Sequence, residues 1–369
     1  MIHDHFFRRI GCRGTLAVLS ICFIGAAPES LRKEAIQAEY LKALPLLQQR
    51  FDHCNGEGLF TTFRIPKGSN SPTVDLNRTW VEFSFAGGRG KTVRTPLDSI
   101  KHDVGGAADE DLAKLKPGRN PGLQAVTAYN QTYSFDLLGA KPAYKVEDLK
   151  ASDKSGRESL INNAGYAACS AFMAYHTPIS VYFGFNDFRL DRVTALSPEM
   201  NPRLKLEFSV IPRPITKPSG YRIASGWFVV NPADEWLIHE YGIVYNWSSS
   251  AQTTNVGRVQ YQTGPDGRSR PARTSYRIYR GKFTADPAAT DPAVIPASGE
   301  DFQFAKFQFG DEPERDFTLS AFGLPEFGQA DAGSFPWVLM VAVAGFAALA
   351  FALRRFSRRE GLSPDRAAG

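Results

Sequence analysis

Much of the chain alternates between hydrophobic and polar residues, which is the pattern of a half-buried β-strand. The clearest case is residues 203–210, where Leu204, Leu206, Phe208 and Val210 alternate with charged or polar neighbours. Comparable runs predict further strands at about 59–65, 80–85, 131–137, 221–231, 235–245, 254–262, 274–283, 301–309 and 315–322. Turn-forming residues separate several of these runs, so the second half predicts an antiparallel meander with one buried face.

Two segments repeat their hydrophobic residues at helical spacing instead. Residues 31–52 form the first predicted helix, in which Pro45 is expected to kink or end a turn. Residues 157–176 form the second, with one apolar stripe made of Leu160, Ala164, Ala168, Phe172 and Tyr175. Both helices are expected to pack on the sheet.

The two ends of the chain carry targeting patterns. A basic start followed by an apolar run predicts a signal peptide, or an uncleaved anchor, over residues 1–27. Residues 335–353 carry no charge and are long enough to cross a bilayer as a helix. Arginines in 354–369 predict a basic cytoplasmic tail, so the body, 28–330, is expected to be extracytoplasmic (periplasmic) in a single-pass cell-membrane protein. A C-terminal sorting signal that is removed by processing is the alternative.

Composition and charge narrow the class of protein. The chain has 369 residues, a net charge of +5, and is 43% hydrophobic and 12% aromatic, which excludes a mainly disordered protein. The basic excess lies at the two ends and the body is balanced, which argues against a nucleic-acid partner. Of four cysteines, Cys54 and Cys169 belong to the mature body. Outside the cytoplasm they can form a disulfide, or each can be a small buried thiol.

Sequence motifs for catalysis or metal binding are missing. The chain has no G-x-S-x-G, H-E-x-x-H, phosphate-binding G-x-x-x-x-G-K-[ST] or C-x-x-C sequence. We therefore expect no catalytic residues, no metal, no cofactor and no enzymatic activity.

Aromatic and aliphatic residues two apart on three predicted strands form the remaining pattern, because residues two apart share one face of a strand. If the strands belong to one sheet, these pairs can join into an apolar surface beside the helix at 157–176. The candidate ligand-binding residues are these three pairs and one tryptophan: Phe83, Phe85, Tyr133, Phe135, Leu206, Phe208 and Trp227.

Two stretches support a resemblance to a known family. Residues 227–238 read as an aromatic strand, an Asn-Pro turn and a second aromatic strand, and residues 317–326 close the body before the apolar segment. This arrangement resembles the periplasmic lipoprotein-carrier (LolA/LolB-like) half-barrel superfamily, over about 31–85, 124–138 and 203–325.

The resemblance implies a mainly β fold with helices (α+β). It would be a curved antiparallel half-barrel sheet capped by helices, with insertions near 97–123 and 139–200 and one C-terminal transmembrane helix. The soluble carriers of this superfamily ferry cargo and have no C-terminal membrane span, so the predicted membrane tether is a difference from them.

The function expected from these patterns is a non-catalytic, membrane-anchored binding domain for a lipid, an acylated protein or another apolar ligand. The alternative is an envelope protein-interaction or sensing ectodomain whose core is closed. An open apolar cleft of several hundred cubic ångströms would favour the first.

Overall fold

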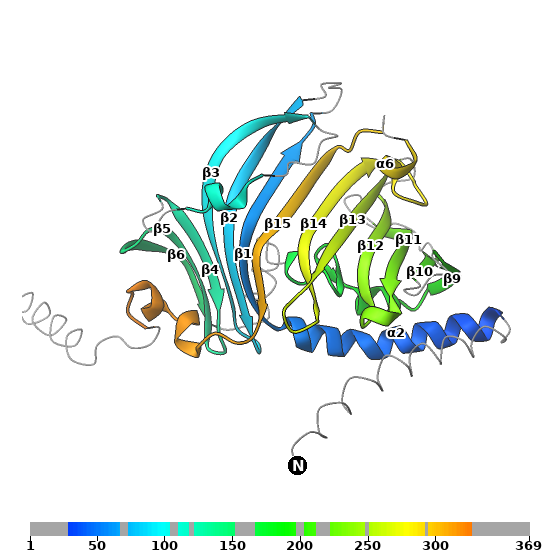
Figure 1. Ribbon diagram of the computed structural model, residues 1–369, viewed down its shortest axis with the longest axis horizontal. Helices are drawn as coiled ribbons and strands as arrows, with labels where there is room; N and C mark the ends of the chain where they lie inside the picture. The colour runs from blue at the N-terminus through cyan, green and yellow to red at the C-terminus, as the bar shows by residue number, and fades with distance from the viewer. Residues whose placement is uncertain are drawn as a thin grey trace, which may run out of the picture. The chain divides into compact units, whose positions relative to one another are not determined.

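One large antiparallel sheet dominates the protein (Figure 1). The computed structural model describes residues 29–66, 73–103, 110–117, 122–151, 167–196, 203–211, 222–247, 251–291 and 294–326. The strands that build this sheet are β1 (His53–Arg64), β2 (Thr73–Ala86), β3 (Gly90–Asp103), β4 (Gln124–Tyr129), β5 (Tyr133–Ala140), β6 (Ala143–Ala151), β9 (Phe188–Ala195), β10 (Leu204–Val210), β11 (Arg222–Asn231), β12 (Leu237–Asn246), β13 (Gln252–Thr263), β14 (Ser269–Arg280) and β15 (Ser298–Phe309).

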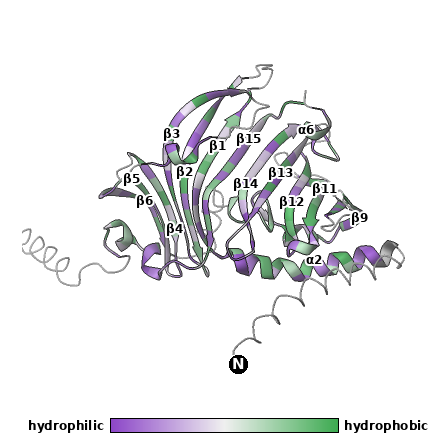
Figure 2. Ribbon diagram, viewed as in Figure 1, coloured by the Kyte–Doolittle hydropathy of each residue, from purple (hydrophilic) through white to green (hydrophobic). Residues whose placement is uncertain are grey.

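The sheet consists of two meanders that meet in the middle. Its order is β6-β5-β4-β3-β2-β1-β15-β14-β13-β12-β11-β10-β9. The first meander runs from β1 outward to β6, and the second runs from β9 at the opposite edge back to β15. Pairing of β1 with β15 joins residues about 250 positions apart, such as Cys54 with Phe309. Hydrophobic and hydrophilic residues alternate along these strands (Figure 2), as the sequence predicts.

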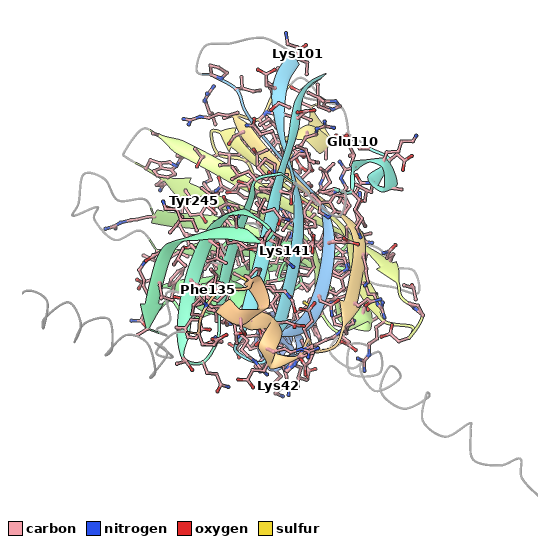
Figure 3. All side chains as sticks on the ribbon, turned by 90° about the vertical axis from the view of Figure 1, so that its left-hand side faces the viewer. Lys42, Lys101, Glu110, Phe135, Lys141 and Tyr245 are labelled. Carbon is pink, nitrogen blue, oxygen red and sulfur yellow. The ribbon has the colours of Figure 1, made fainter. Side chains whose placement is uncertain are left out.

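One long helix, α2 (Glu29–Phe51), lies across one end of the strands (Figure 1). We call this the α2 end of the sheet, and the opposite end of the same strands the far end. Lys42 on α2 and Lys101 on β3 mark the two ends in Figure 3. The helix predicted at 31–52 is present, and it continues through Pro45. The predicted hairpin at 227–238 is present as well, as β11, the turn η2 (Pro232–Asp234) and β12.

The main hydrophobic core lies on one face of the sheet, which we call the core face. Inward side chains of α2, such as Tyr40, Leu47 and Phe51, cover it at the α2 end. Residues 167–185 cover it further along, and include the hairpin β7 (Met173–Ala174) with β8 (Thr177–Pro178) and the short helix α5 (Ile179–Phe183). The opposite face is called the outer face below.

The expected α+β class, a half-barrel sheet capped by helices with a transmembrane helix, is wrong. The described chain is mostly β, with few helices beside α2. Residues 167–176 of the second predicted helix form turns and a short strand. They are almost wholly buried from Ala167 to Ala174, so no polar helix face is presented to solvent, and packing overrides the local periodicity. The predicted insertions near 97–123 and 139–200 contain part of β3 and all of β6, β7, β8 and β9.

The C-terminal part also differs from the prediction. Residues 315–322, expected as a strand, form the 3₁₀ turns η3 (Glu314–Phe317) and η4 (Leu319–Phe322). One compact unit ends at Phe317 and a second begins at Thr318. Within the described residues, no helix has both the length and the apolar character that membrane crossing requires. The signal segment 1–27, the predicted span 335–353 and the tail 354–369 lie outside the described residues.

Candidate functional site

Four of the candidate ligand-binding residues lie together in the packed core. Phe83, Phe85, Leu206 and Phe208 are all on the core face, and each is at most 3% exposed. The ring of Phe208 packs parallel to that of Phe228, with ring centroids 5.1 Å apart. The core face around these four residues is therefore filled by protein side chains rather than open to a ligand.

Tyr133 and Phe135 lie on the outer face. Directly paired residues of an antiparallel sheet point to the same side. The register carries the core face from Phe83 on β2 across β3 and β4 to Asp136 on β5, without a bulge. Successive side chains of a strand point to opposite faces, so Phe135 points away from the core face, and Tyr133, two residues before it, points the same way. Tyr133 and Phe135 therefore cannot extend the surface made by Phe83. Figure 3 labels Phe135 at this edge of the sheet.

Trp227 also lies on the outer face. It pairs with Glu207, a neighbour of Leu206 and Phe208, and packs with Val229 and other outer-face residues in a separate small core. Its indole N–H donates to Glu240 Oε1 at 2.9 Å. A single continuous surface of all seven predicted residues is thus not formed, because the sheet buries apolar side chains on both faces.

Both body cysteines are buried thiols on the core face. The Cys54 thiol donates to the Phe51 carbonyl at 3.1 Å. Burial raises the pKa of Cys54, and the neighbouring Cys169 thiol raises it further. The two residues are thus brought near each other, and no disulfide joins them in this structure.

A cavity of about 800 Å³ lies at the far end of the sheet, which we call the far-end cavity. It collects the last residues of β1 and β14 and the first residues of β13 and β15. Ser298 of β15 is directly opposite both Arg64 and Ile278, so three strands contribute one row of the wall. The lining residues are Arg64, Ile65, Pro66, Thr253, Ile278, Arg280, Ala297 and Ser298.

A group of hydrogen-bonded polar side chains lies next to this cavity, on the side that faces the α2 end. We call Tyr175, Tyr241, Asn255, Tyr276 and Glu300 the tyrosine layer. Register places Tyr276 opposite Glu300, two residues along from Ile278 and Ser298 on the same face. The tyrosine layer thus separates the far-end cavity from the phenylalanine-rich core around Phe302.

The tyrosine layer is held by stacking and hydrogen bonds. The Tyr175 ring stacks on that of Tyr276 with centroids 3.9 Å apart and planes 3° from parallel. Tyr175 also donates its backbone N–H to the Tyr241 hydroxyl at 2.7 Å and its own hydroxyl to Glu300 Oε1 at 3.2 Å. These contacts hold Tyr175 at a φ of 56°, which is unusual for a residue other than glycine.

Burial keeps the tyrosine hydroxyls of the layer and the neighbouring His176 uncharged. Burial raises the pKa of the Tyr175, Tyr241 and Tyr276 hydroxyls well above the ordinary tyrosine value, and the Glu300 carboxylate raises each further. Beside them, burial lowers the pKa of His176 to about 4. All four groups are therefore uncharged at neutral pH.

The mouth of the far-end cavity, in contrast, is cationic. Arg64 and Arg280 are both exposed, and the described part of the chain gives neither guanidinium a hydrogen bond or an ion pair. The described residues contain no group of three or more His, Cys, Asp or Glu residues that could hold a metal ion. The cavity thus combines apolar walls, two hydroxyl groups and two positive charges.

Sequence patterns did not single out these cavity residues. Arg64 and Arg280 end their strands, and each alone reads as an ordinary solvated charge. The cavity exists only because β1 pairs with β15 and β15 with β14, which the local sequence does not specify.

Comparisons with known proteins leave the family open. No family model matches the chain, and no curated protein matches it. A DUF1329 family protein from Desulfovibrio piger ATCC 29098 is similar in structure, with a TM-score of 0.37 and 10% identity over 78% of this chain and 98% of that chain. A luciferin-regenerating enzyme matches with a TM-score of 0.12 and 9% identity over 69% of this chain and 95% of that chain. These TM-scores are too low to assign a fold or a function, and the likeness to LolA/LolB-like carriers stays a prediction.

Proposed function

We propose that this chain is a non-catalytic binding domain that holds a lipid, an acyl chain or another apolar ligand in the far-end cavity. The observation that carries the proposal is the cavity itself. Its volume of about 800 Å³ falls within the range of roughly 300–1,000 Å³ that small-molecule sites occupy. Ile65, Pro66 and Ile278 supply apolar wall, and the hydroxyls of Thr253 and Ser298 supply polar contacts.

Exposed hydrophobic side chains support a role for the same end of the molecule. Trp247 and Ile295 are 45% and 47% exposed; Trp247 follows β12 and Ile295 precedes β15, both at the far end of the sheet. Solvent-exposed apolar groups beside a cavity favour contact with an apolar partner. The basic and apolar N-terminal run supports an extracytoplasmic location for this body.

Filling the cavity tests the proposal. Ser298→Trp places an indole on the cavity wall, whereas Gln308→Trp places the same side chain at an exposed position of the same strand. The neutral dye Nile red, titrated into the full-length chain, should bind to wild type and to Gln308→Trp but at least tenfold more weakly to Ser298→Trp. Equal binding by all three proteins would remove the cavity from consideration.

The alternative is a protein-interaction or sensing ectodomain with a closed core. It is favoured by one observation, the close packing of Phe83, Phe85, Leu206 and Phe208 beneath α2 and residues 167–185. A wild-type chain that takes up no apolar dye would support this alternative.

A further inference from the structure

We propose that the ligand of the far-end cavity is an anionic amphiphile, whose acidic group is bound at the mouth by Arg64 and Arg280. This inference rests on the proposed function, because it concerns the ligand of the same cavity. It adds a charge, an orientation and two specificity-determining residues, none of which an apolar cavity alone requires.

The register brings the two arginines to one mouth. Arg64 and Ile278 lie on either side of Ser298 in one row, and Arg280 lies two residues beyond Ile278 on the same face. At about 4.8 Å between strands and 3.3 Å per residue, the two Cα atoms are roughly 12 Å apart. Two arginine side chains across that span can converge on one group between them.

The charges of the two guanidinium groups are available to a ligand. Nearby Arg277 shows the usual arrangement, since its guanidinium is on the outer face and pairs with Asp301 at 2.7 Å. Arg64 and Arg280 have no such pair in the described residues. A planar guanidinium matches the geometry of carboxylate and phosphate oxygens, so an acidic headgroup is the chemistry that complements this mouth.

A negative charge two residues from Ser298 on the same face sets the orientation of the ligand. Glu300 is the acidic side chain of the tyrosine layer, and its carboxylate accepts from the Tyr175 hydroxyl. A negative group placed deep in the cavity would be repelled by Glu300, whereas at the mouth it meets positive charge. The apolar part therefore points inward along Ile278, and the acidic group stays at the solvent edge.

Matched ligands that differ only in charge test this inference on the full-length chain. Decanoate, decanol and decyltrimethylammonium, each below its aggregation concentration, compete with Nile red. We expect decanoate to bind about tenfold more tightly than decanol, which corresponds to a difference in binding free energy of about 1.4 kcal/mol. Two solvent-exposed ionic contacts share this difference. The cation should bind most weakly. The Arg64→Gln/Arg280→Gln double variant should lose this preference and still bind decanol, while Arg268→Gln, an exposed arginine at the opposite hairpin tip, should keep it.

Salt gives a second readout that needs no variant. The preference of wild type should disappear between about 10 mM and 1 M salt, because the screening length falls from about 30 Å to about 3 Å. Short-chain phosphatidylglycerol and phosphatidylcholine distinguish the source of the acidic group. Stronger competition by the former than by decanoate indicates a lipid headgroup, and the reverse order indicates a free acid.

Each failure has a separate meaning. Equal binding of decanoate and decanol, or a preference that survives in the double variant or in high salt, overturns the charge inference and leaves the apolar cavity intact. Absence of Nile red and decanol binding in wild type overturns the proposed function, and this inference with it.

Discussion

Replacing Phe208 with alanine measures how tightly the core face is packed. Phe208 is 2% exposed and contacts two further rings in near-parallel stacks, Phe228 at 5.1 Å and Phe188 at 5.2 Å between centroids. Removing a buried phenylalanine side chain costs about 3–5 kcal/mol, because apolar contacts are lost and a cavity remains. Stacked aromatic pairs contribute about 0.5–1.5 kcal/mol each, so we expect Phe208→Ala to cost more than the lower limit of that range, about 4 kcal/mol.

Urea unfolding followed by tryptophan fluorescence gives the free energy of unfolding. With a slope of roughly 3 kcal/mol per molar urea, a loss of about 4 kcal/mol lowers the midpoint by about 1.3 M. The control is Ile211→Ala, one residue beyond the same strand, where the side chain is 60% exposed and we expect a change below about 1 kcal/mol. A similarly small change for Phe208→Ala would show that this ring borders open space, and would refute the closed packing described here.

Further predictions concern the backbone, the thiols and pH. Gly257→Ala should destabilise the fold by about 1–3 kcal/mol or more, measured by thermal unfolding, since an added Cβ would collide with the Tyr241 ring; full stability would contradict the placement of that ring. Cys54 and Cys169 should react with a thiol reagent only after denaturation, because both are buried, and rapid reaction in the native protein would be inconsistent with this core. Burial lowers the pKa of His239 to about 4, below its unfolded value of about 6.5, so protonation favours the unfolded chain. The stability that His239 contributes is complete above pH 6.5 and lost as pH falls toward 4, and urea midpoints of His239→Gln should fall less over that range than those of wild type.

The sequence alone determined the parts of this fold that depend on local periodicity. Helix α2 was predictable because its apolar residues recur at helical spacing over several turns, enough to bury one face against a sheet. The strands of the second meander other than β9 were predictable for a similar reason, since their alternation extends over seven or more residues. The β11–β12 hairpin was marked by the turn residues Asn231 and Pro232, and the Asn231 side chain indeed caps that turn.

Tertiary structure decided which face each strand presents and what covers it. The alternation of side chains along a strand predicts that Tyr133 and Phe135 share a face. Only the pairing register shows that this face is opposite to the face of Phe83. Burial also reshaped residues 167–176, where the helical spacing of small residues gave way to turns that pack on the core face. The far-end cavity depends on the same long-range pairing, because Arg64 and Arg280 are 216 positions apart and meet only across β15. A local sequence pattern carries no information on such contacts, because the free energy that selects them comes from the assembled core rather than from any one segment.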